Sequence, residues 1–156
     1  MRNTTLRPKT VTALAVFGLA LAGLAACSPS AAGPTTVPVD LAEYAIQPAV
    51  AEVAAGSVTF TARNIGPNDP HELVVVRTDL AGDALPTGAD GRFDEAAPGV
   101  EVVGKIGELA VGAEGSATFD LPAGRYVLVC NVVEVEGDEE VEAHYAEGMH
   151  TAFTVR

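Results

Sequence analysis

The chain has 156 residues, 21 of them acidic and nine basic, so its formal net charge is −12 at pH 7. This length suits one domain with its own core rather than two. A surface of this sign repels nucleic acid, which excludes nucleic acid as a partner, and it would steer basic protein partners into encounter. Solubility alone is the other explanation of the charge.

The first 26 residues have the composition of an export signal. An apolar stretch, Val11 to Leu24, contains Gly18 and Gly23, and three basic residues precede it: Arg2, Arg7 and Lys9. Secretory signals have this arrangement, whereas the alternative, a membrane-spanning helix, needs roughly 20 apolar residues. We therefore expect residues 1–26 to be a signal peptide.

The signal ends in Leu24-Ala25-Ala26-Cys27, which resembles the bacterial lipobox at every position. The resemblance implies cleavage before Cys27 and lipidation of its thiol, which would anchor the protein to the extracytoplasmic, periplasmic face of the cell membrane. Residues 28–36 are small, polar and interrupted by proline. We expect residues 27–36 to be a lipidated cysteine and flexible tether, followed by one monomeric domain at residues 37–156.

Cleavage would leave six basic and 21 acidic residues, a net charge of −15, and one unmodified cysteine, Cys130. In an oxidising compartment a lone thiol is buried and inert, reactive, or held by a metal.

Short apolar runs broken by turn residues about every ten positions predict an all-β domain of seven to eight strands, packed as a sandwich. The clearest strands are Asp40 to Ile46, Ser57 to Arg63, Glu72 to Arg77, Glu101 to Lys105, Ser116 to Asp120, Arg125 to Cys130 and Thr151 to Val155. Residues 80–98 lack periodicity and predict a long connection with a helical turn. Glu134 to Glu147 holds seven acidic residues and is interpreted as a solvated loop.

Four residues of the domain could together hold a metal: His71, Cys130, His144 and Met149. Singly, each has an ordinary explanation, such as a turn histidine, a buried thiol, an exposed histidine or a core methionine. Together, a thiolate, two imidazoles and a thioether suit copper, because soft sulfur and nitrogen serve its two oxidation states. Zinc prefers four firm ligands, or three and a water. The third histidine, His150, is the alternative to His144.

The sequence resembles the cupredoxins, the plastocyanin- and azurin-like copper proteins, over residues 37–156. The likeness rests on the turn-rich run before His71, on Gly124-Arg125-Tyr126 leading to Cys130, and on the His-x4-Met spacing of His144 and Met149. It implies a Greek-key β-sandwich and copper bound by His71, Cys130 and His144, with Met149 as a weak axial ligand. The 13 residues between Cys130 and His144 exceed the few of compact members.

The resemblance implies a carrier of single electrons, not an enzyme, with His144 as the exposed exit and the acidic segment recognising a basic redox partner. The alternative function is a copper-binding protein that delivers copper to a membrane oxidase, although the domain has only one methionine. A metal-free structural domain would lack ligands, and none is missing. Copper enzymes with a second copper site need more histidines than the three present.

Overall fold

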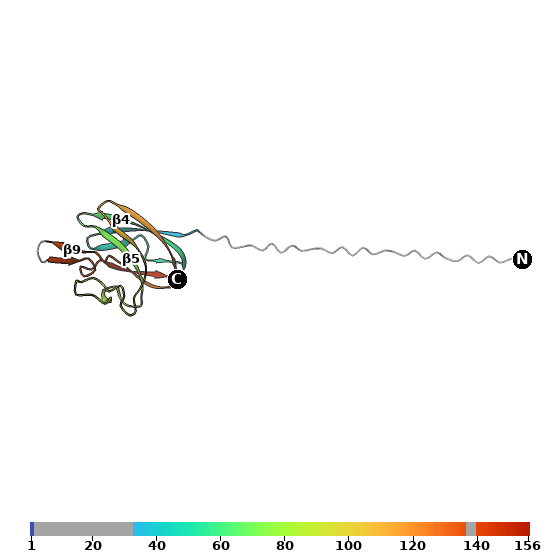
Figure 1. Cartoon of the computed structure of the whole chain (residues 1–156). Coiled ribbons are helices and arrows are strands. Elements are labelled where there is room, and N and C mark those ends of the chain that lie inside the picture. Colours follow the sequence, from blue (N-terminus) through green and yellow to red (C-terminus); the bar gives the residue numbers. More distant parts are fainter. Residues whose placement is uncertain (2–32, 137–139) are drawn as a thin grey trace. The chain divides into compact units, whose positions relative to one another are not determined.

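The computed structural model describes residue 1, residues 33–136 and residues 140–156 (Figure 1). The expected signal peptide, Cys27 and residues 28–32 of the expected tether lie outside the described residues. Among the described residues, no helix is long and apolar enough to cross a membrane.

Two sheets form the body of the domain. The first has the order β2-β1-β4-β7 and consists of β1 (Thr35–Ala42), β2 (Ala45–Pro48), β4 (Gly56–Gly66) and β7 (Glu114–Leu121). The second has the order β3-β11-β8-β5-β6 and consists of β3 (Glu52–Val53), β5 (His71–Arg77), β6 (Glu101–Leu109), β8 (Gly124–Val129) and β11 (His150–Val155). A separate hairpin pairs β9 (Val133–Glu136) with β10 (Glu140–Ala143).

The sheets pack face to face because one side of most strands is apolar. In β4, Val58, Phe60 and Ala62 are fully buried, and the residues between them face outward, as their alternation predicts. They share one core with Leu73 and Leu128 of the second sheet. The predicted all-β sandwich is therefore confirmed.

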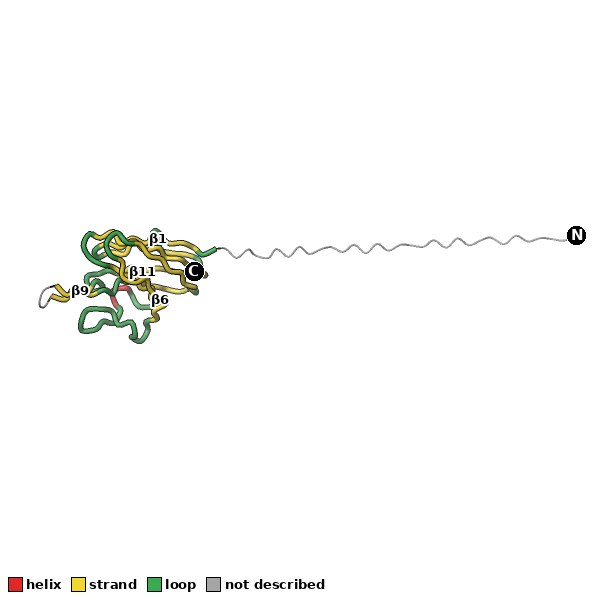
Figure 2. The backbone as a smooth tube through the Cα atoms, turned by 45° about the horizontal axis from the view of Figure 1, so that its top comes forward, coloured by secondary structure: helices red, strands yellow, loops and turns green. Residues whose placement is uncertain are grey.

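The second sheet is also covered on its outer side. Val74, Val76 and Val127 face away from the main core and form a second cluster with Leu85 and Phe93 of the long connection. This connection, residues 78–100, contains one 3-10 turn, η1 (Gly82–Ala84), in agreement with the prediction. Figure 2 shows it as the green loop beneath the strands. Because both faces are covered, β5 is buried along almost its whole length.

Two predicted elements were wrong. The strand expected over Asp40 to Ile46 is divided by a turn at Glu43 and Tyr44, so its two halves belong to β1 and β2. The segment Glu134 to Glu147, interpreted as a loop, contains the β9–β10 hairpin, which projects from the end of the domain opposite the C-terminus (Figures 1 and 2). The described residues form eleven strands, more than the seven to eight predicted, and β1 begins at Thr35, two residues before the expected domain boundary.

Candidate metal centre

His71, Cys130 and His144 meet at one end of the sandwich, which we call the site end. One ligand atom from each, the Sγ of Cys130 and a ring nitrogen of each histidine, lies within 4.8 Å of the other two. The Nδ1 atoms of His71 and His144 are 3.2 Å apart, and the Sγ of Cys130 is 3.4 Å from the Nδ1 of His144. All three side chains are completely buried.

A hydrogen-bonded loop delivers His71 to the first position of β5. The fully buried Asn64 donates from Nδ2 to the carbonyl oxygens of Asp69 (2.7 Å) and Leu109 (2.8 Å), and its Oδ1 accepts from the backbone N–H of Gly66 (2.8 Å). Gly66 has a φ of +59°, a left-handed conformation that glycine adopts without strain. Asn64 thus closes the turn immediately before His71.

Cys130 follows the last residue of β8, and its sulfur lies among apolar side chains. The backbone N–H of Glu72 donates to its Sγ at 3.4 Å. Burial raises the pKa of the thiol to about 11, although this hydrogen bond opposes the shift. At neutral pH the metal-free thiol is therefore protonated, and a metal must displace its proton.

A tight loop carries both His144 and Met149. The backbone N–H of Met149 donates to the carbonyl of His144 at 2.9 Å, and the carbonyl of Met149 accepts from the N–H of Cys130 at 3.0 Å. Met149 is therefore directly opposite Cys130, where β8 and β11 end their pairing. Its side chain is fully buried in the same core cluster as Cys130.

His150 does not join the group. Its ring lies against that of Tyr145, with centroids 5.4 Å apart, and beside Gly82 of η1. It begins β11 and pairs with Val129, one register position beyond Met149 and Cys130. Of the two histidines in this region, His144 is the one that faces Cys130.

The turn between β1 and β2 adds two residues that the sequence interpretation missed. The Oε1 atom of Glu43 lies 3.6 Å from the Nε2 of His71, and the ring of Tyr44 meets that of His144 edge to face, with centroids 5.3 Å apart. The expectation that His144 is exposed was therefore wrong, because its side chain is fully buried. The sequence interpretation missed Glu43 and Tyr44 because it predicted one continuous strand over Asp40 to Ile46, where the structure has a turn.

The electrostatics of the site favour neutral imidazoles and an ionised glutamate. Burial lowers the pKa of both His71 and His144. Burial would raise the pKa of Glu43, but hydrogen bonds from the backbone N–H groups of Asp69 and Asn68 outweigh it and leave that pKa lowered. Neutral histidines keep a nitrogen lone pair for a metal.

A second group of possible ligands, Asp69, Glu134 and His144, also lies within 4.8 Å. It shares His144 with the first group, and its two carboxyl side chains are only half-buried. The group with Cys130 is the one whose three members are all buried and which contains sulfur. We therefore take the first group as the candidate metal centre.

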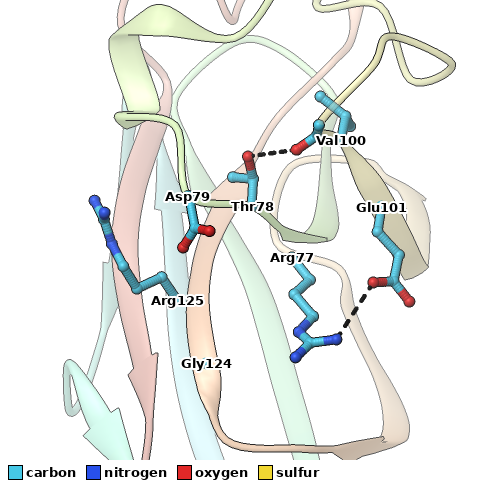
Figure 3. A pocket seen from close by; sticks show the side chains of 8 residues that line it. Arg77, Thr78, Asp79, Val100, Glu101, Gly124 and Arg125 are labelled. Carbon is cyan, nitrogen blue, oxygen red and sulfur yellow. Dashed lines mark hydrogen bonds and ion pairs between the residues drawn. The ribbon is translucent and has the colours of Figure 1, made fainter.

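An open pocket of about 340 Å³ lies at the opposite end of the domain, where β5 ends and β8 begins (Figure 3). Arg77 pairs with Glu101 at 3.6 Å across it, and Thr78 donates from Oγ1 to the carbonyl of Gly99 at 2.7 Å. The pocket is separate from the buried centre, because none of the residues that line it is a candidate ligand.

No protein-family model matches this chain, and no curated protein does. Its structure is similar to several solved proteins. Dithionite-reduced auracyanin from the photosynthetic bacterium Roseiflexus castenholzii is 26% identical, with a TM-score of 0.55, and the match covers 78% of this chain and 97% of auracyanin. Auracyanin A, a "blue" copper protein of Chloroflexus aurantiacus, is 21% identical (TM-score 0.53; 80% and 100% covered). Rusticyanin of Thiobacillus ferrooxidans is 18% identical (TM-score 0.51; 80% and 79% covered).

Proposed function

We propose that this chain, whose fold is that of the cupredoxins it resembles, carries single electrons through one mononuclear type 1 copper ion. The ligands would be His71, Cys130 and His144, with Met149 as the weak axial ligand. The observation that carries the proposal is the fully buried group of one thiol and two imidazoles whose ligand atoms lie within 4.8 Å.

The donor set fits copper. Bound copper would supply a one-electron couple between its two oxidation states. The chain's part is to hold a thiolate, two neutral imidazoles and a thioether in a rigid, dry site that suits both states. Cys130 and Met149 are joined by a backbone hydrogen bond and His144 and Met149 by another, so the three side chains are fixed relative to one another. The N–H of Glu72 on the sulfur partly offsets the thiolate charge.

Burial of the centre supports electron transfer over catalysis. His71, Cys130, His144 and Met149 are all fully buried, so the described residues around them would shield a bound copper ion from substrates. An electron must instead leave through the covering residues. Tyr44 is half-buried and its ring contacts that of His144, so it offers one such route from the centre to the surface.

We also propose that the protein acts as a monomer on the extracytoplasmic face of the membrane, held by a lipid on Cys27. The lipobox and tether support this anchor, and the charge of −15 after cleavage supports a basic redox partner. The β9–β10 hairpin lies between Cys130 and His144 in the chain, and its register sets Glu142 opposite Glu134 and Glu140 opposite Glu136. The hairpin therefore places acidic sequence directly before His144 in the chain, which supports a partner of the opposite charge at the site end.

The test is optical and uses matched cysteine variants. The protein loaded with copper(II) should show the intense thiolate-to-copper band at the red end of the visible spectrum. Cys130→Ser should abolish the band, whereas Cys27→Ser should keep it and lose membrane attachment. A colourless wild-type protein would contradict the proposed copper site. A coloured protein that rapidly transfers its copper to a chelator or an acceptor protein would instead favour the alternative function, copper delivery to a membrane oxidase.

A further inference from the structure

Glu43 reaches from the first sheet to a histidine of the second. It lies in the turn between β1 and β2, its side chain is only 11% exposed, and its Oε1 lies 3.6 Å from the Nε2 of His71. The same Oε1 accepts hydrogen bonds from the backbone N–H groups of Asn68 (2.9 Å) and Asp69 (2.8 Å). Glu43 therefore binds the backbone of the loop that precedes His71 and also faces the ring of His71.

Each of these two side chains has a buried polar atom without a hydrogen-bond partner among the described residues: the Oε2 of Glu43 and the Nε2 of His71. Buried polar atoms in folded proteins are almost always paired. These two are complementary, because a carboxylate oxygen only accepts and an imidazole N–H donates. The distance that joins the two side chains, from the Oε1 of Glu43 to the Nε2 of His71, is 3.6 Å and exceeds an ordinary hydrogen bond by about half an ångström.

The tautomer of His71 follows from which nitrogen faces the centre. Its Nδ1 lies 3.2 Å from the Nδ1 of His144, inside the ligand group. A neutral imidazole that offers the Nδ1 lone pair must carry its proton on Nε2. That proton points toward Glu43.

We propose that Glu43 is a positioning residue that accepts the Nε2–H of His71 and thereby holds the Nδ1 lone pair toward the metal. This inference rests on the proposed ligand role of His71. Ligating histidines commonly donate their second nitrogen to a carboxylate, which fixes the ring and increases its basicity. Here the carboxylate is held in turn by the N–H groups of Asn68 and Asp69, so one side chain fixes both the loop and the ring.

The metal-free protein provides a test that does not depend on copper. With Glu43 as acceptor, His71 is protonated on Nε2 and its Nδ1 accepts from the Nδ1–H of His144, 3.2 Å away. Nitrogen-15 spectra of the imidazole rings should show these two tautomers. A His71 protonated on Nδ1 in the wild-type protein would overturn the proposal, whether or not the protein binds copper.

Glu43→Gln is the informative variant. A glutamine can still accept the two backbone N–H groups through its oxygen, but its neutral amide is a weaker acceptor for the Nε2–H of His71 than a carboxylate, and its NH₂ replaces the unpartnered Oε2. The variant should shift His71 toward the Nδ1–H tautomer and weaken copper(II) binding about tenfold or more. Glu147→Gln is the matched control, because Glu147 is exposed in the loop between His144 and Met149 and its loss removes the same charge near the site.

The reduction potential is the second readout. Because a carboxylate behind the ring favours the more highly charged oxidation state, Glu43→Gln should raise the potential. A tenfold change in the ratio of copper(II) to copper(I) affinity corresponds to 59 mV for a one-electron couple. An unchanged tautomer and potential in a folded, blue Glu43→Gln protein would overturn the proposal. A colourless wild type would instead overturn the copper function and leave the tautomer test valid.

Discussion

The ring of Tyr44 meets the ring of His144 edge to face, with centroids 5.3 Å apart, and the imidazole beneath it has no exposed surface. Tyr44 belongs to the first sheet's β1–β2 turn, whereas His144 lies in the loop between β10 and β11. The aromatic ring therefore separates the candidate metal centre from solvent.

Removal of this ring should open the centre. We expect Tyr44→Ala to increase the rate at which a chelator extracts copper by roughly tenfold or more. A tenfold increase corresponds to a decrease of about 1.4 kcal/mol in the activation free energy of extraction. Stopped-flow loss of the blue colour measures it. Tyr44→Phe keeps the ring and should behave as wild type. Equal extraction rates in the wild type and Tyr44→Ala would show that Tyr44 does not gate access.

The turn before His71 should depend on Asn64. Asn64→Ala leaves the carbonyls of Asp69 and Leu109 and the N–H of Gly66 without their partner. Because buried groups left unpaired cost about 1–3 kcal/mol, we expect a loss of about 2–4 kcal/mol in the free energy of unfolding. Urea denaturation of the metal-free protein measures it. Asn68→Ala is the control, since the Asn68 side chain is exposed, and an equal loss in both variants would contradict this role.

Metal binding should release a proton from Cys130. Burial raises the pKa of its thiol to about 11, so the group is protonated throughout the neutral range and only the thiolate binds. The apparent metal affinity should therefore rise about tenfold per pH unit between roughly pH 7 and 9, and level off only as pH approaches the thiol pKa. Calorimetry with Zn²⁺ as a redox-inert substitute, in buffers of different ionisation enthalpy, measures the proton count. Release of no proton would show that the thiol does not bind.

The raised pKa of the Cys130 thiol also predicts how the stability of the metal-free protein changes with pH. Because the folded state holds the thiol proton more tightly than the unfolded state, this contribution to stability is fully present below about pH 9 and is lost as pH rises through about 11. Two pKa units correspond to about 2–3 kcal/mol. The difference in unfolding free energy between wild type and Cys130→Ala should narrow over this range. A difference independent of pH would refute the raised pKa.

The acidic hairpin should set the rate of encounter with a basic partner. Replacing Glu140 and Glu142 together by glutamine should slow electron transfer to a cationic cytochrome c several-fold at low ionic strength, and the difference should vanish at high salt. Glu52→Gln with Glu101→Gln removes the same charge at the other end of the domain and is the control. Equal slowing in both double variants would assign the effect to net charge rather than to the hairpin.

The sequence predicted the strands whose side chains alternate. It also predicted which candidate ligands stand at the ends of neighbouring strands. The alternation of Val58, Phe60 and Ala62 placed β4, and the structure brings His71 and Cys130, 59 positions apart, to the same end of the second sheet. These features follow from the chain's own periodicity and from strand ends that meet when neighbouring strands pair.

Contacts between distant turns could not be predicted in this way. Nothing near Glu43 in the chain indicates that it reaches His71, because that contact depends on how the two sheets pack. The residues around Glu43 and Tyr44 also include no glycine, proline or asparagine, and the lack of these turn residues concealed the turn. In the hairpin, Val133 and Val135 alternate with glutamates as strand residues do, but the density of charge favoured a loop interpretation.

The direction of β1 has a consequence for any tethered form of this protein. β1 starts at Thr35 beside the beginning of β4 and ends at Ala42 beside its last residue, Gly66, just before the turn that covers the ligands. Seven residue steps at about 3.3 Å each separate these ends by about 23 Å. With a lipid on Cys27, the chain would therefore enter the domain at the pole remote from the metal. The tether and the site end would then lie at opposite ends of β1, so the tether would leave the residues that cover the ligands free for a partner.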